Sequence, residues 1–166
     1  GPKRVAAALK LVEFHTRRKQ AGMALEAAKF AHSKAPEDFE TLVAYAKAKL
    51  AANDVTGGRI ALKDAGRVAE NDADRLLGVA LLQNLAGDAG GALYTLDKAL
   101  SAQPGFLAAE ALLVEVELRQ GDVAKAERRA AGITAREPRR AIGFSLLGDV
   151  FSAKAQPAAA VDAYRK

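Results

Sequence analysis

The sequence predicts an all-α protein, a solenoid of about five helical hairpins, and two observations carry this prediction. The first is a pattern that returns every 34 residues, with short polar turns at Lys19-Gln20, Asn53-Asp54, Gly87-Asp88 and Gly121-Asp122. The second is the spacing of apolar residues beside these turns, three and four apart, which places them on one face of a helix. A period of this length is typical of helical hairpins that bury their apolar faces by stacking on their neighbours.

One unit of the repeat is clearest between residues 73 and 106. It holds two amphipathic segments, 74–85 and about 90–102, separated by Gly87-Asp88 and closed by Pro104. Extending this frame predicts one array over residues 5–166, made of units 5–38, 39–72, 73–106, 107–140 and a truncated 141–166. Residues 1–4 are expected to be a tag scar and lead-in, and the array is expected to be a fragment of a longer one.

The residues at fixed positions of the unit resemble those of the tetratricopeptide repeat (TPR). The fifth unit matches best, through Phe144, Leu147, Gly148, Phe151, Ala160 and Tyr164. The resemblance implies a right-handed superhelix of antiparallel helical pairs without strands. It also implies close approach of the two helices of each hairpin at paired small residues: Val12/Ala24, Ala46/Gly58, Ala80/Ala92, Val114/Ala126 and Gly148/Ala160.

The turns between helices are expected to combine a flexible residue that ends one helix with an aspartate or asparagine that caps the next. A proline near the end of the unit should stop the second helix. The second unit departs from this pattern, because Glu70 replaces the proline and Gly57, Gly58 and Gly66 weaken its second helix. It is therefore expected to be the least stable unit.

Composition excludes several classes of site. The chain has 166 residues and no cysteine, which rules out disulfides and thiolate metal sites, and no apolar run is long enough to span a bilayer. The net charge of +5 is modest, and a nucleic-acid surface would be expected to line one face more heavily with basic residues. We therefore expect no nucleic-acid partner.

The search for catalytic, cofactor or metal residues predicts none. His15 and His32 stand at different repeat positions without ligand spacing, and His15 is expected to pack at a helix interface, where the TPR pattern has an aromatic residue. The Gly87-x-x-Gly90-Gly91 stretch superficially resembles a phosphate loop, but it lacks the Lys-Ser/Thr ending and follows a predicted helix rather than a strand. A non-enzymatic protein is predicted.

The resemblance implies a binding surface on the concave side, which the first helices of TPR units line. The lysine and asparagine that clamp a C-terminal carboxylate in chaperone-associated TPR domains are absent here. An apolar stripe takes their place, and a stripe of this kind, rimmed by charge, often marks an interaction site. The predicted groove residues are Val43, Lys47, Leu50, Leu77, Leu81, Leu85, Glu115 and Leu118. The alternative, in which these leucines only pack between neighbouring helices, stays open.

The leading functional hypothesis is a scaffold that holds a segment of a protein or peptide partner in this groove. The alternatives are a cytoplasmic TPR adaptor and, with less support, an RNA-binding helical-repeat protein. Two stretches, 118–127 and 141–149, resemble the bacterial TPR lipoproteins of PEP-CTERM protein sorting and exopolysaccharide production. That resemblance implies a place in the cell envelope, with any membrane contact made through a lipid anchor outside this sequence.

Overall fold

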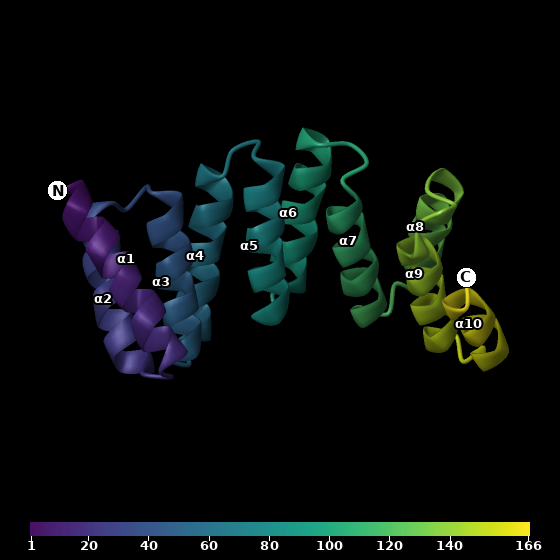
Figure 1. The fold of residues 1–166 in the computed structure, drawn as a ribbon, viewed down its shortest axis with the longest axis horizontal. Helices are drawn as coiled ribbons and strands as arrows, with labels where there is room; N and C mark the ends of the chain where they lie inside the picture. The colour runs from purple at the N-terminus through teal and green to yellow at the C-terminus, as the bar shows by residue number, and fades with distance from the viewer. The chain divides into compact units, whose positions relative to one another are not determined.

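The computed structural model describes all 166 residues, which form ten α-helices and no strand, so the predicted all-helical fold is confirmed (Figure 1). The chain divides into two compact units, residues 1–95 and 96–166, and the division falls inside α6. The helices are α1 (Pro2–Arg17), α2 (Ala21–Lys34), α3 (Phe39–Ala51), α4 (Val55–Val68), α5 (Ala73–Leu85), α6 (Ala89–Ala102), α7 (Leu107–Arg119), α8 (Val123–Arg136), α9 (Ala141–Ala153) and α10 (Pro157–Tyr164).

The helices follow the period seen in the sequence. Helices α3, α5, α7 and α9 begin at residues 39, 73, 107 and 141, where the sequence places position 1 of successive repeats. Within residues 1–95, α1 packs on α2, α2 on α3, α3 on α4 and α4 on α5. Within residues 96–166, α7 packs on α8, α8 on α9 and α9 on α10. The grouping of residues 5–166 into a single array stays a prediction.

The small residues expected at the helix contacts are buried in all five predicted hairpins, from Val12 and Ala24 to Gly148 and Ala160. A side chain at Gly58 would lie 2.6 Å from Cδ2 of Leu50, so the absence of a side chain there lets α3 and α4 approach. The core positions expected in the central unit are also buried: Leu76, Val79, Ala80, Gln83, Leu96 and Ala99. The predicted core face is confirmed.

One residue in each of the four predicted interhelical turns, and one in the turn between α9 and α10, has a left-handed backbone, and these five residues lie 34 apart. They are Lys19, Asn53, Gly87, Gly121 and Ala155, with φ between 55° and 83°. Gly87 and Gly121 take this conformation without steric cost, whereas the β-carbons of Lys19 and Ala155 crowd the backbone. The turn geometry is therefore imposed by the hairpin even where the sequence does not favour it.

Replacing Ala155 with glycine is expected to raise the free energy of unfolding by about 1 kcal/mol, because the left-handed conformation costs alanine about that much. Urea denaturation of the wild type and the variant would measure the difference. The matched control is Gly121→Ala at the equivalent turn, which should lower stability by a similar amount. A destabilising Ala155→Gly change would contradict this account of the turn.

Aspartates cap four helices. Two of these caps, Asp54 and Asp88, stand where the sequence predicts them, whereas the side chain of Asp122 makes no capping hydrogen bond at the start of α8 and pairs with Lys125 instead, so that predicted cap is wrong. The side chains of Asp38, Asp54, Asp72 and Asp88 each accept a hydrogen bond from the backbone N–H three residues later. Helix α4 ends at Val68 although Glu70 replaces the usual proline, and Glu70 has a left-handed φ of 52°. The end of α4 is thus formed by a left-handed turn that is followed by the Asp72 cap of α5; the lower stability of this unit stays a prediction.

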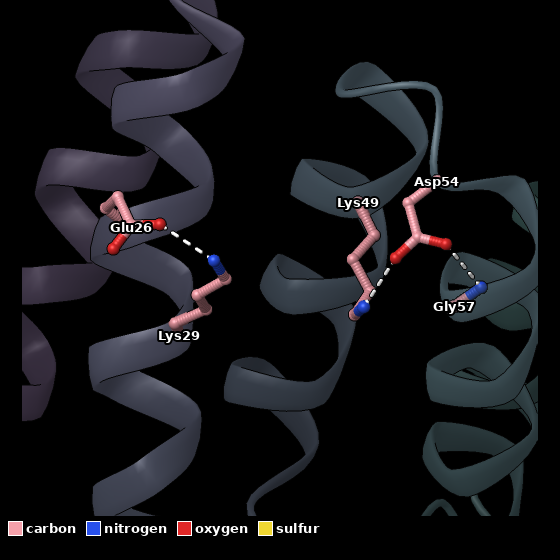
Figure 2. Close-up of polar contacts among 5 residues, drawn as sticks. All are labelled: Glu26, Lys29, Lys49, Asp54 and Gly57. Carbon is pink, nitrogen blue, oxygen red and sulfur yellow. Dashed lines mark hydrogen bonds and ion pairs between the residues drawn. The ribbon is translucent and has the colours of Figure 1, made fainter.

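The cap of α4 is part of a small polar network (Figure 2). One carboxylate oxygen of Asp54 accepts a hydrogen bond from the Gly57 N–H at 2.9 Å, and the other lies 2.6 Å from Nζ of Lys49. A β-carbon at Gly57 would lie within 2.5 Å of both Oδ2 of Asp54 and Nζ of Lys49, so a side chain there would displace the Lys49–Asp54 pair. The Lys49 ammonium, followed by the Gly57 N–H, holds the pKa of Asp54 below its ordinary value of 3.8.

Replacing Asp54 with alanine is expected to lower the melting temperature at pH 7. A carboxyl group with a lowered pKa stabilises the fold above its ordinary pKa and loses this effect as the pH falls through its folded-state value. The gap between wild type and Asp54→Ala should therefore close below pH 3.8. Thermal melts from pH 7 to pH 2.5 would test this, with Asp64→Ala as the control, because Asp64 has no hydrogen-bond partner. A gap that stays constant over this range would contradict the assignment.

Candidate functional site

The clearest candidate site is a pocket between α3 and α5, the first helices of two successive repeats. It has a volume of about 480 Å³ and is largely apolar. Helix α3 contributes Phe39, Val43 and Lys47, and α5 contributes Asp74, Arg75, Gly78, Leu81 and Leu82. Three of the predicted groove residues, Val43, Lys47 and Leu81, thus line one pocket.

Charged side chains surround this pocket. The guanidinium of Arg75 lies 4.8 Å from the centre of the Phe39 ring, in a cation–π arrangement, and its Nε is 3.5 Å from Oδ2 of Asp72. Lys47 and Asp74 are exposed and form no ion pair within the chain. An apolar floor with an available cation and an available anion at its edge can hold an apolar side chain and orient the polar groups beside it.

The predicted groove leucines within residues 1–95 lie in different environments. Leu81 is 45% exposed and Leu85 is 79% exposed, so both are available to a partner, although Leu85 lies outside the pocket. Leu77 is half-buried and is not part of the pocket lining. Leu50 packs against Gly58 and the core of its own hairpin, which favours a structural role.

The last two predicted residues, Glu115 and Leu118, belong to residues 96–166. Glu115 is exposed and pairs with Arg119 one helical turn away at 2.5 Å. Leu118 is half-buried and packs against the core formed by α7, α8 and α9. The hypothesis that all eight predicted residues line one continuous groove stays a prediction.

Sequence reasoning missed several residues of the pocket: Phe39, Asp74, Arg75, Gly78 and Leu82. Gly78 carried a usable signal, because a glycine inside a helix lowers helix stability and often has a packing or functional reason. No atom lies within 4 Å of the point where its β-carbon would be, so Gly78 leaves open space. Phe39 and Arg75 carried no such signal, because their ring contact depends on how α3 and α5 pack.

The histidines make structural contacts. Nδ1 of His15 is 2.8 Å from Oε1 of Gln20, and its ring meets Phe14 edge-on. The His32 ring stacks on Tyr45 with centroids 4.7 Å apart. No group of three His, Asp or Glu side chains is placed to hold a metal ion, and none of the helices combines the length and apolar character needed to cross a membrane.

The glycine-rich stretch that superficially resembles a phosphate loop is a repeat turn. Gly87 has a left-handed φ of 70°, and the N–H of Gly91 donates to the Asp88 carboxylate. An aspartate thus occupies the place at the start of α6 that a phosphate would need. The repeat-turn interpretation of this stretch is confirmed.

Comparison with known proteins supports the assignment of the fold. The family model of the tetratricopeptide repeat matches residues 83–149. A solved structure of TPR-like repeats from a kinesin light chain of Podosopora anserina has a TM-score of 0.78 and 16% identity, covering 99% of this chain and 93% of that one. The fold is a TPR fold. No curated protein sequence shows significant similarity to this chain.

Two further TPR structures resemble this chain over most of its length. The MamA protein has a TM-score of 0.72 and 15% identity, covering 99% of this chain and 90% of that one. The protein YrrB, described as a TPR protein with an unusual peptide-binding site, has a TM-score of 0.62 and 13% identity, covering 94% of this chain and 80% of that one. At these identities the likeness establishes the fold alone.

Proposed function

We propose that this chain is a non-enzymatic scaffold that binds a segment of a partner protein in the pocket between α3 and α5. The observation that carries the proposal is the exposure of Leu81, 45% accessible in the wall of a pocket whose other apolar side chains, Phe39, Val43 and Leu82, are partly buried. The core of the protein does not use this side chain. Proteins of the TPR fold generally mediate protein–protein interactions, and the peptide-binding site of YrrB is consistent with this role.

The pocket also indicates the chemistry of the partner segment. Its apolar lining suits a large aliphatic or aromatic side chain. An acidic residue beside that anchor would meet Lys47, and a basic residue would meet Asp74. We therefore expect an apolar anchor bracketed by opposite charges, and a helical or extended segment can present this pattern.

Replacing Leu81 with aspartate tests the proposal. The new carboxylate would lie where an apolar side chain of the partner excludes water from the pocket. We therefore expect the variant to bind at least tenfold more weakly, a loss of about 1.4 kcal/mol in binding free energy. The melting temperature should change little, because Leu81 is already partly in water in the free protein. The probe is a set of peptides selected against the wild-type chain from a random display library, with affinities measured by calorimetry.

A second variant separates pocket filling from loss of stability. Gly78→Gln would place a side chain into open space while removing a glycine from the interior of α5, so the helix should become more stable as the pocket becomes smaller. Weaker peptide binding by both variants, with the fold intact, supports the proposal. Normal binding by both would mean that partners dock elsewhere. Unfolding of Leu81→Asp would mean that Leu81 is part of the core.

The finer part of this proposal is a place in the bacterial cell envelope, in exopolysaccharide production or PEP-CTERM protein sorting. It rests on the resemblance of residues 118–127 and 141–149 to TPR lipoproteins of that system. The amino-terminal sequence of the full-length protein would test it. A signal sequence ending in a lipid-accepting cysteine would support export and anchoring, and a cytoplasmic location of the full-length protein would exclude them.

A further inference from the structure

A second charged surface lies on the α7–α8 hairpin and is built around a buried acid. The Glu117 side chain, on α7, is only 5% exposed, and its two carboxylate oxygens accept hydrogen bonds from Arg129 of α8. The Nη2–Oε1 distance is 2.9 Å and the Nε–Oε2 distance is 3.3 Å. This two-point contact fixes the plane of the guanidinium and leaves its Nη1 donors free of Glu117.

Two more cations stand beside Arg129 on α8. Lys125, Arg128 and Arg129 are three and four residues apart, so they share one side of the helix. With Glu117 they line a solvent-open hollow of about 390 Å³. Nζ of Lys125 is 2.7 Å from Oδ2 of Asp122, and Arg128 forms no ion pair within the chain.

The electrostatics of this hollow favour an anion. Asp122 raises the pKa of Lys125 through a hydrogen bond and its charge, with a smaller contribution from Glu117, while Arg128 opposes the shift. These groups therefore lie within electrostatic reach of one another. Arg129 pairs with Glu117, and Lys125 pairs with Asp122. The positive charge of Arg128 therefore has no ion-pair partner, and it lies beside the Arg129 guanidinium, which Glu117 holds in place.

We propose that Lys125, Arg128 and Arg129 form a second binding site that takes a carboxylate from an acidic segment of a partner protein. One carboxylate carries the single negative charge that compensates Arg128, and it fits the planar fork of a guanidinium. A phosphate dianion would add excess negative charge next to the buried Glu117. Single-stranded RNA is less suited to the hollow because no aromatic side chain lines it for base stacking.

The probe is a hexaglutamate peptide blocked at both ends, titrated at low salt while backbone amide shifts are recorded by NMR. The expected result is that the largest shifts fall in α8 and at the end of α7. Arg128→Gln should weaken binding by about fivefold or more, because it removes a cation that has no structural partner. Arg139→Gln is the matched control, since it removes the same charge from an exposed arginine outside the hollow.

Each outcome bears on the proposal. Weakening by Arg128→Gln but not by Arg139→Gln supports it. Equal weakening by both variants means that only net charge matters, which overturns it. Tighter binding of inorganic phosphate or hexauridylate RNA to the same residues overturns the assignment to an acidic protein segment, as does the absence of shifts with hexaglutamate. The outcome is independent of the pocket between α3 and α5, which Leu81→Asp tests separately.

Discussion

Replacing Arg129 with methionine should lower the free energy of unfolding by about 3 kcal/mol, because it would leave the Glu117 carboxylate buried without a partner. The Glu117 side chain is 5% exposed, and Arg129 is the cation that hydrogen-bonds both of its oxygens. An isolated buried charge loses its hydration and gains nothing in return. Urea denaturation at pH 7 would measure the loss.

Two further variants separate this effect from general disruption of α8. Arg128→Met, at the adjacent position, should change stability by less than about 0.5 kcal/mol, because Arg128 has no ion-pair partner. The double variant Glu117→Leu with Arg129→Leu should recover most of the stability, since a buried ion pair can often be replaced by apolar side chains of similar size. If Arg129→Met is as mild as Arg128→Met, Glu117 finds another partner or is not truly buried.

Replacing Leu96 with alanine should cost about 2–5 kcal/mol, because the truncation removes buried apolar surface and leaves a cavity. Leu96 is fully buried, at the position of the second helix where the repeat pattern requires a large apolar residue. Thermal and urea unfolding would both report the loss.

The same substitution at an exposed leucine is the matched control. Leu85 is 79% exposed, so Leu85→Ala removes the same atoms from water rather than from the core and should cost less than about 0.5 kcal/mol. A loss below about 1 kcal/mol for Leu96→Ala would contradict the assignment of the core face.

Much of the fold could be predicted because each hairpin is specified by local signals. Helix periodicity identified the face of α5 that carries Leu76, Val79 and Ala80, and all three are buried. The aspartates of two turns, Asp54 and Asp88, predicted helix caps, because a capping side chain bonds to backbone only three residues away, whereas Asp122 pairs with Lys125 and does not cap α8. The residues that make these interactions are only a few positions apart, so the interactions can be predicted from a short stretch of sequence.

The groove was predicted only in part, because a place on a first helix does not by itself separate exposed leucines from packed ones. Leu50 and Leu81 both lie on first helices, yet Leu50 packs on Gly58 whereas Leu81 faces a pocket. The difference comes from the neighbouring helix: Gly58 of α4 leaves room that the Leu50 side chain fills. Likewise, Gly78 of α5 leaves space that no other side chain occupies.

By itself, the sequence determined that the chain is helical, where its helices turn and which helical faces form the core. Only the tertiary structure decided that Glu117 is buried against Arg129, that Arg75 lies over Phe39 and that Leu81 stays accessible. The physical reason is the separation of the interacting residues along the sequence. Caps and helical faces depend on residues within one or two turns, whereas these contacts join different helices, and their side-chain geometry is set by how closely those helices pack.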